Sequence, residues 1–81
     1  MERTAIVEKL TSIFREIFSD GTLVLRDDMT AAEVDNWDSL THMLMISRVE
    51  KEFGVKFKLK EVNRLNTVGD IIDLLIQKSS E

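Results

Sequence analysis

Residues 38–54 read DSLTHMLMISRVEKEFG, and both ends of this stretch carry residue types that begin or end helices. Asp38 and Ser39 have side-chain oxygens that can accept hydrogen bonds from the free backbone N–H groups of a first helical turn. Gly54 can adopt the left-handed conformation that commonly follows a helix. Between these ends, apolar residues recur every three or four positions, as they do on one face of a helix. The stretch therefore predicts a helix that starts at Asp38 and ends near Phe53.

This predicted helix has apolar residues on two opposite faces, whereas a surface helix of a globular protein is normally polar on one face. One face, which is sufficient to pack against a core, contains His42, Met45, Ile46, Val49 and Phe53. The opposite face, here called the docking strip, contains Leu40, Met43, Leu44 and Ser47. Two interpretations are open: the preceding loop buries the docking strip, or the strip is exposed and contacts partner proteins. Methionine suits such a contact because its flexible thioether adapts to different surfaces.

The residues before this helix predict a first helix and a long loop. Apolar residues at helical spacing predict a helix over 5–18, with Thr4 as its N-cap and Gly21 available for a left-handed C-cap. The irregular stretch that follows, up to Trp37, is the longest in the chain, and the capping-box pattern of residues 30–33 predicts one helical turn within it. The side chains that could anchor this loop in the core are Leu23, Leu25, Met29, Val34 and Trp37.

The residues after the central helix predict two further helices. Residues 55–59 alternate between apolar and basic, which predicts an extended connector whose apolar side chains, including Leu59, point inward. A short helix is expected over 60–65. Residues 67–70 have capping-box spacing and open a last helix with a wide apolar face. We therefore predict an all-α fold, in which a single domain over residues 1–81 forms a small bundle of three main helices and one short helix with a long first loop.

The composition excludes several classes of function. The 81 residues include 15 acidic and 11 basic side chains, which gives a net charge of −4, whereas a nucleic-acid-binding protein needs a basic face. The chain has no cysteine, which excludes disulfides and thiolate metal sites and fits a reducing cytoplasm. No apolar run approaches the roughly 20 residues of a membrane span, and the first residues lack the pattern of a secretory signal. We expect a cytoplasmic monomer without a metal site, since the acidic loop also lacks the spacing of a calcium-binding EF-hand.

Ser39 is the residue with the most specific chemical potential. Its hydroxyl follows a long loop and should be accessible, and a helix N-terminus stabilises a phosphate group through its free N–H groups and its dipole. The simpler interpretation is that Asp38 and Ser39 only cap the helix. A Ser-His-Asp triad with His42 can also be drawn, but a bundle of this size offers no evident oxyanion hole or cleft.

Asp38-Ser39-Leu40 at the start of a helix that ends in EKEFG, followed by a last helix that opens with TVGD at residues 67–70, resembles the acyl carrier protein family. The resemblance extends over nearly the whole chain. It implies that Ser39 accepts a 4′-phosphopantetheine arm from coenzyme A, in a reaction catalysed by a separate phosphopantetheinyl transferase. The thiol of the arm would hold acyl groups as thioesters for acyl-loading and acyl-transferring enzymes. The protein would then be a carrier and not an enzyme.

The resemblance also implies roles for other residues. Asp38 would cap the helix and be a recognition contact, and Leu40 and Glu50 match positions that partner enzymes touch. Met43 and Leu44 extend this partner surface along the docking strip. Members of this family can fold a fatty chain into the bundle, and the candidates for lining such a space are Ile46, Val62 and Leu65.

The charges of the chain depart from those of typical fatty-acid carriers. Thr41, Leu44 and Lys51 occupy positions that are often acidic in such carriers, and residues 56–60 are basic where those carriers tend to be acidic. Docking should therefore depend more on the apolar strip and less on charge, and residues 37–42 look more like carriers dedicated to specialised pathways, including aminoacyl carriers. We expect a specialised pathway of fatty-acid, lipid or polyketide type. Two alternatives remain open: an aminoacyl or peptidyl carrier, and an unmodified helical interaction domain that binds partners through the docking strip.

Overall fold

The computed structural model describes residues 2–79, and four α-helices and one 3-10 turn follow one another in this part of the chain. Their bounds are Arg3–Ile17 for α1, Ala31–Glu33 for the 3-10 turn η1, Ser39–Phe53 for α2, Leu59–Val62 for α3 and Val68–Ser79 for α4. A single isolated antiparallel bridge joins Thr30 to Thr67, and residues 2–79 contain no longer strand. Three main helices and one short helix confirm the predicted all-α fold class.

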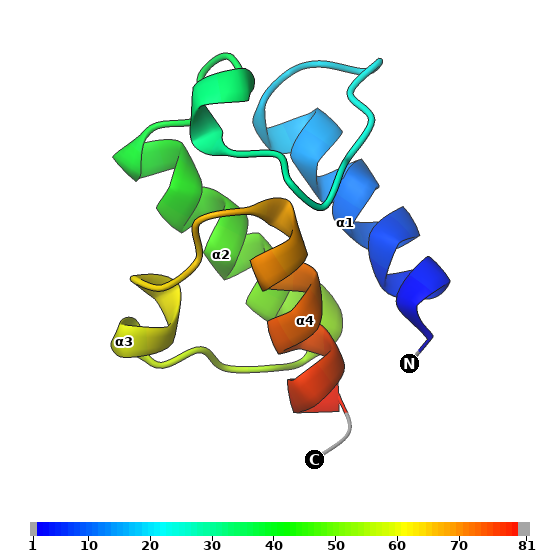
Figure 1. Cartoon of the computed structure of the whole chain (residues 1–81), viewed down its shortest axis with the longest axis vertical. Helices are drawn as coiled ribbons and strands as arrows, with labels where there is room; N and C mark the ends of the chain where they lie inside the picture. The colour runs from blue at the N-terminus through cyan, green and yellow to red at the C-terminus, as the bar shows by residue number, and fades with distance from the viewer. Residues whose placement is uncertain (1, 80–81) are drawn as a thin grey trace.

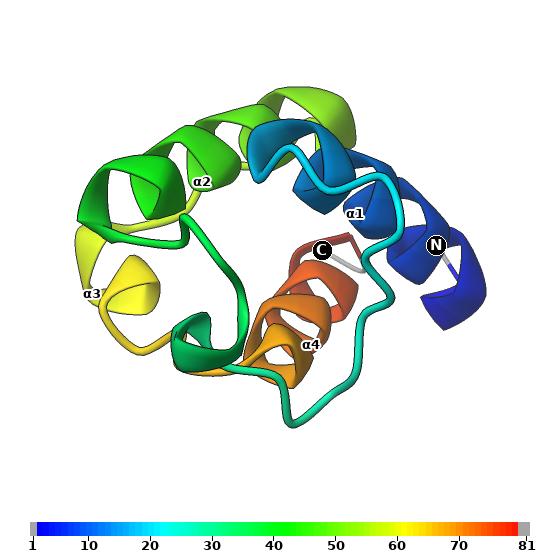
Figure 2. The same cartoon turned by 90° about the horizontal axis from the view of Figure 1, so that it is seen from above.

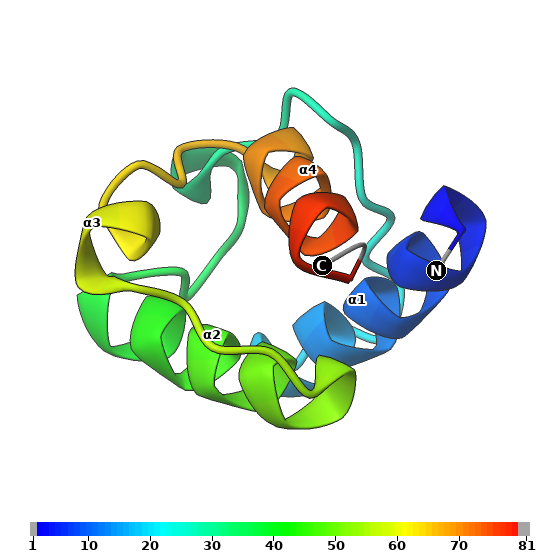
Figure 3. The same ribbon diagram turned by 90° about the horizontal axis from the view of Figure 1, so that it is seen from below.

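The three long helices surround a common core, and α3 lies at its edge beside the N-terminal half of α2 (Figures 1 and 2). The long loop between α1 and α2 crosses one end of the bundle. Figure 3 shows the connector from α2 to α3 running back along α2. The start of α2 therefore lies at the loop end of the molecule, with α3 as its neighbour.

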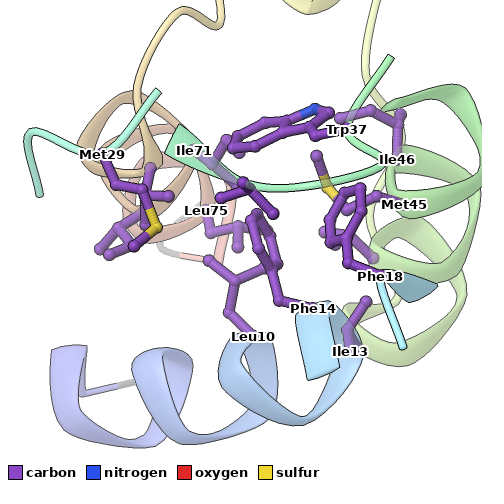
Figure 4. Packing of buried hydrophobic residues seen from close by; sticks show 14 of the residues in the cluster. Leu10, Ile13, Phe14, Phe18, Met29, Trp37, Met45, Ile46, Ile71 and Leu75 are labelled. Carbon is purple, nitrogen blue, oxygen red and sulfur yellow. The ribbon is translucent and has the colours of Figure 1, made fainter. Parts of the chain in front are cut away.

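Trp37 anchors the end of the long loop in the core (Figure 4). Its ring centroid lies 5.3 Å from that of Phe14 and 5.5 Å from that of Phe18, and aromatic pairs of this kind stabilise a fold by about 0.5–1.5 kcal/mol beyond their buried area. Met29 and Val34 are also buried, while Leu23 and Leu25 pack partly against the core, so all five predicted anchors of the loop contact it.

The loop leaves the docking strip of α2 uncovered. Leu40, Met43 and Leu44 are 70%, 47% and 50% exposed, because the loop follows its own anchors into the core instead of crossing the outer face of α2. Met45 and Val49 on the opposite face are fully buried. The interpretation in which the loop buries the strip is therefore wrong, and the strip is free to contact other molecules.

Two predictions about the ends of α1 are wrong. The helix begins at Arg3 and not at Ala5, so Thr4 is a helical residue and Glu2 occupies the N-cap position without a side-chain hydrogen bond. The left-handed residue after α1 is Ser19, with φ of 54°, and not Gly21. The chain reverses as soon as the last helical turn has closed, so the glycine comes too late to take this position.

The end of α2 and the start of α4 follow the prediction more closely, whereas α3 ends at Val62 and not at Leu65. Gly54 is left-handed, with φ of 65°, and ends α2. Thr67 and Asp70 form the predicted capping box of α4, with two N–H···O bonds of 3.1 Å between them. Leu59 contradicts the prediction, because its side chain is 72% exposed. The connector ends one residue earlier than predicted, and Leu59 is the first residue of α3, on its outer side.

Candidate functional site

Ser39 is the first residue of α2, and its side chain is exposed. Its hydroxyl makes no hydrogen bond with any residue in the range 2–79, whereas the nearby polar side chains of Asp38 and Thr41 are both hydrogen-bonded. The N-terminus of a 15-residue helix favours a negative charge at this position, through its dipole and its free N–H groups. An accessible hydroxyl at such a position fits the attachment of a phosphodiester.

Asp38 and Thr41 hold the start of α2 by a reciprocal pair of hydrogen bonds. The backbone N–H of Thr41 donates to Asp38 Oδ1 at 2.9 Å, and the backbone N–H of Asp38 donates to Thr41 Oγ1 at 2.8 Å. The first of these bonds lowers the pKa of Asp38 below its ordinary 3.8, so the carboxylate is ionised at neutral pH. Thr41 Oγ1 also donates to the backbone carbonyl of Asn36 at 2.6 Å. Asp38 is thus a helix cap, as predicted, and this network fixes the backbone on which Ser39 is mounted.

Trp37 and His42 form a second link across the same helix start. The indole Nε1–H of Trp37 donates to His42 Nδ1 at 3.0 Å, and the two rings are nearly parallel, at 15°. Because an indole N–H can only donate, His42 Nδ1 carries no proton and the imidazole is neutral. Burial lowers the pKa of His42 below 6.5, although a hydrogen bond to the backbone of Val62 opposes this shift. Since Asp38 is bonded to Thr41 and His42 to Trp37, these side chains form no Ser-His-Asp relay.

A hollow of about 520 Å³ opens beside Ser39, between the start of α2 and α3. Among its lining residues are Trp37, Ser39, His42, Met43, Val62 and Leu65. Two of the three residues predicted to line an acyl chain, Val62 and Leu65, therefore border a space that Ser39 also borders. The third, Ile46, is 3% exposed and belongs to the core.

The residues predicted to contact partners fall into two groups. Leu40, Met43 and Leu44 form the exposed docking strip beside Ser39. Glu50 is half-buried, and its Oε2 accepts a hydrogen bond of 2.8 Å from the backbone N–H of Phe57. The structure thus gives Glu50 a second role, in which it holds the connector that leads to α3.

Comparison with known proteins identifies the family. Residues 8–75 match the family model described as "Phosphopantetheine attachment site". An acyl carrier protein from Thermosynechococcus vestitus is 32% identical to this chain over 78 residues, which is 96% of each protein. The chain belongs to the acyl carrier protein family. The solution NMR structure of a holo acyl carrier protein from Geobacter metallireducens is 40% identical, and it matches 91% of this chain and 85% of its own with a TM-score of 0.86.

This membership defines the general activity. The acyl carrier protein bears a covalently attached 4′-phosphopantetheine and is a carrier and not an enzyme. It interacts with the phosphopantetheinyl transferase and with acyl-handling enzymes in general. In the described part of the chain, no helix has the length and apolar character needed to cross a membrane. The same residues contain no group of three or more His, Cys, Asp or Glu side chains that could hold a metal ion.

Several residues of the site were not predicted to contact one another. Thr41 completes the cap of α2, and the Asp-x-x-Thr spacing of residues 38–41 is the signal that could have shown this. The bonds between Trp37 and His42 and between Glu50 and Phe57 have no comparable signal. They depend on the paths that the loop and the connector take across α2.

Proposed function

We propose that Ser39 is the residue that carries the phosphopantetheine arm, and that residues 1–81 act as one carrier domain. The supporting observation is an exposed hydroxyl, unbonded within residues 2–79, at the N-terminus of α2, beside a hollow that the arm can enter. Ser47 is also exposed, but it lies inside α2, where the backbone N–H groups are used within the helix. Position, and not exposure alone, therefore favours Ser39.

In the proposed reaction, a phosphopantetheinyl transferase supplies coenzyme A, Mg²⁺ and the general base. The Ser39 oxygen attacks the phosphorus next to the pantetheine of coenzyme A and forms the new phosphodiester bond. The pyrophosphate linkage of coenzyme A breaks, adenosine 3′,5′-bisphosphate leaves, and the serine proton passes to the base of the transferase. The attached arm then supplies the thiol that holds an acyl group as a thioester. Asp38 keeps the helix start in place through Thr41 and presents its ionised carboxylate beside Ser39 to the transferase. The chain itself has no cysteine, so the arm provides the only thiol of the holo protein.

We also propose that the partners belong to a specialised fatty-acid, lipid or polyketide-type pathway. Leu40, Met43 and Leu44 offer an apolar contact next to the arm, while Thr41 is engaged in the helix cap and presents no carboxylate there. An aminoacyl or peptidyl cargo remains the alternative, because the arm and not the helical domain holds the cargo. We also propose that the protein is a cytoplasmic monomer. The residues proposed to line an acyl chain are Ile46, Val62 and Leu65.

Intact mass spectrometry tests the attachment. The purified protein is incubated with coenzyme A, Mg²⁺ and a broad-specificity transferase, with Ser39→Ala and Ser47→Ala in parallel. We expect the wild type and Ser47→Ala to gain one phosphopantetheine and Ser39→Ala to gain none. Ser39 is an exposed side chain without a bond to the described residues, so Ser39→Ala should change stability by no more than about 0.5 kcal/mol.

Circular dichroism and thermal unfolding show whether each variant is folded before its mass is interpreted. A folded wild type that gains no group with several transferases would favour the unmodified interaction domain. A folded Ser39→Ala variant that still gains the group would place the arm on another residue.

A further inference from the structure

Four exposed basic residues surround an exposed leucine on and beside α3. Lys56, Lys58, Lys60 and Arg64 are all exposed, and none of them forms an ion pair with a residue in the range 2–79. Leu59 is 72% exposed, more than any other large apolar residue described. These five residues are here called the α3 basic surface. It stands out on a chain whose net charge is −4.

The two carboxylates nearest to this surface are already engaged. Glu61 Oε1 accepts a hydrogen bond of 2.7 Å from the backbone N–H of Lys58 and pairs with Lys78 Nζ at 3.0 Å. Asp70 Oδ2 accepts bonds of 3.0 and 3.1 Å from the backbone N–H groups of Asn66 and Thr67. Glu61 shares its charge with Lys78, and Asp70 keeps its charge while bonded to neutral N–H groups, so the four cations of the α3 basic surface outnumber these two carboxylates.

The segment that carries the α3 basic surface also borders the proposed site of arm attachment. Val62, Asn63 and Leu65 form the α3 side of the hollow that Ser39 borders, so a protein that reaches Ser39 approaches α3 as well. The two glutamates of α2, Glu50 and Glu52, lie in its second half and are bonded to the backbone of Phe57 and to Arg48. Asp38 is the single acidic residue among those that line the hollow.

We propose that the α3 basic surface docks onto an acidic patch of an acyl-handling enzyme, beside the opening through which that enzyme receives the arm. Leu59 would insert among apolar groups within the patch, and the four cations would face its carboxylates. The identification of the partner as an acyl-handling enzyme rests on the proposed function, whereas the preference for an acidic protein surface rests on the charges of α3. Charge complementarity of this kind selects partners and accelerates their encounter.

An anionic membrane and a second copy of the chain fit these observations less well. Leu59 is the only apolar residue of the surface, which is little for insertion into a bilayer, and the net charge of −4 opposes approach to anionic lipids. In a second copy, the acidic loop would be the complement, but three of its six carboxylates already pair with an arginine of the same chain. Asp27 pairs with Arg3 at 2.6 Å, and Arg26 pairs with both Asp28 and Glu33.

NMR amide shifts of the full-length protein test the proposal. The probes are a capped peptide of two glutamates, a leucine and two glutamates, the same peptide with lysine in place of glutamate, and vesicles of phosphatidylcholine and phosphatidylserine. We expect the acidic peptide to shift the amides of residues 56–64 in a saturable manner, with weaker binding at higher salt. The basic peptide should leave these amides in place, and the vesicles should not broaden the spectrum.

Two double variants with the same change of net charge provide the control. Lys56→Glu with Lys60→Glu should abolish the shifts, whereas Lys9→Glu with Lys51→Glu, two exposed lysines elsewhere, should retain them. The proposal is overturned if the acidic peptide causes no shift, if the two variants behave alike, or if the vesicles bind. Concentration-dependent shifts of the same amides without peptide would also overturn it in favour of self-association. None of these readouts requires the arm, so a failure here is separate from a failure of Ser39 attachment.

Discussion

Trp37 and His42 are the only tryptophan and the only histidine of the chain, and they are bonded to each other beside Ser39. The bond requires an unprotonated His42 Nδ1, because protonated imidazole donates from both nitrogens. Burial lowers the pKa of His42 below 6.5 in the folded state. His42 is therefore harder to protonate in the folded protein than in the unfolded one. Its bond to Trp37 is fully present above pH 6.5 and is lost as the pH falls through the lowered pKa of His42.

This pairing predicts a pH-dependent tryptophan fluorescence signal. We expect a transition with a midpoint below pH 6.5, where the indole loses its acceptor and its contact with the imidazole, while circular dichroism still shows a folded protein. His42→Gln should remove the transition, since the amide does not titrate. A midpoint at or above 6.5, or a transition that persists in His42→Gln, would show that the bond is not what the fluorescence reports.

The sequence predicted some residue roles well because they depend on close neighbours. Asp38 as a cap follows from its place before an apolar helical pattern, and Gly54 as a left-handed stop follows from its place after it. Glu50 is different, since its bond to the Phe57 backbone depends on the course of the connector. Leu59 was misplaced for the same reason: an alternating pattern predicts a strand-like face, but α3 begins at that residue.

The N-terminus of α4 holds the long loop in place. Its first two N–H groups, those of Val68 and Gly69, donate to the backbone carbonyls of Met29 and Asp27, both at 2.9 Å. A side chain at position 69 would interfere with this contact, because a Cβ atom there would lie 2.9 Å from the carbonyl oxygen of Asp27. Glycine at this position therefore permits a close approach between loop and helix.

Gly69→Ala should lower the free energy of unfolding. Displacing a packed backbone costs about 1–3 kcal/mol, and the better helix propensity of alanine, at most about 1 kcal/mol, offsets part of this cost. Gly21→Ala is the matched control, since nothing lies within 4 Å of the added Cβ. The control should range from neutral to about 1 kcal/mol more stable. Urea unfolding measures both, and equal effects would mean that the loop yields to the added methyl group.

The presence of the helices could be predicted from the spacing of apolar residues, whereas the path of the long loop could not. The apolar spacing of residues 5–18 predicted α1 despite the error at Thr4, and the capping box at residues 67–70 predicted the start of α4. Whether the loop would bury the docking strip could not be predicted. The answer depends on where its anchors, above all Trp37, find space between helices that are distant in the sequence.

Acid should destabilise the whole molecule. Hydrogen bonds and nearby charges lower the pKa of four carboxyl groups below the ordinary values of 3.8 for aspartate and 4.5 for glutamate. These groups belong to Glu16, Asp20, Asp38 and Glu61. A lowered pKa means that the folded state binds protons less readily than the unfolded state. The stability that these groups provide is therefore present above pH 4.5 and is lost as the pH falls through their lowered pKa values.

We expect the urea midpoint to fall progressively below pH 4.5. Glu16→Gln removes one of the two carboxylates that pair with Arg48, at 2.8 Å, so the midpoint of this variant should vary less with pH in this range. Exposed pairs contribute little individually, so the difference between the two profiles is the quantity to compare. A midpoint that rises on acidification would contradict these assignments.

The fold and the general activity could be predicted from the sequence because the order of the helices and Asp38-Ser39-Leu40 are local features of the chain. The cargo could not be predicted, since it is attached to the arm and not to a side chain of the protein. The surfaces that we propose for partner contacts, the docking strip and the α3 basic surface, have a shape that depends on tertiary packing. The exposure of these surfaces depends on the paths of the long loop and of the connector to α3.

Whether Ser39 carries the arm can be read from the protein isolated from the cells that produce it, by peptide mapping with tandem mass spectrometry. We expect the peptide that contains Ser39 to carry one phosphopantetheine, alone or with an acyl group as a thioester, and all other peptides to be unmodified. A group attached at any other residue, or a protein without the group under every growth condition, would contradict the proposed function.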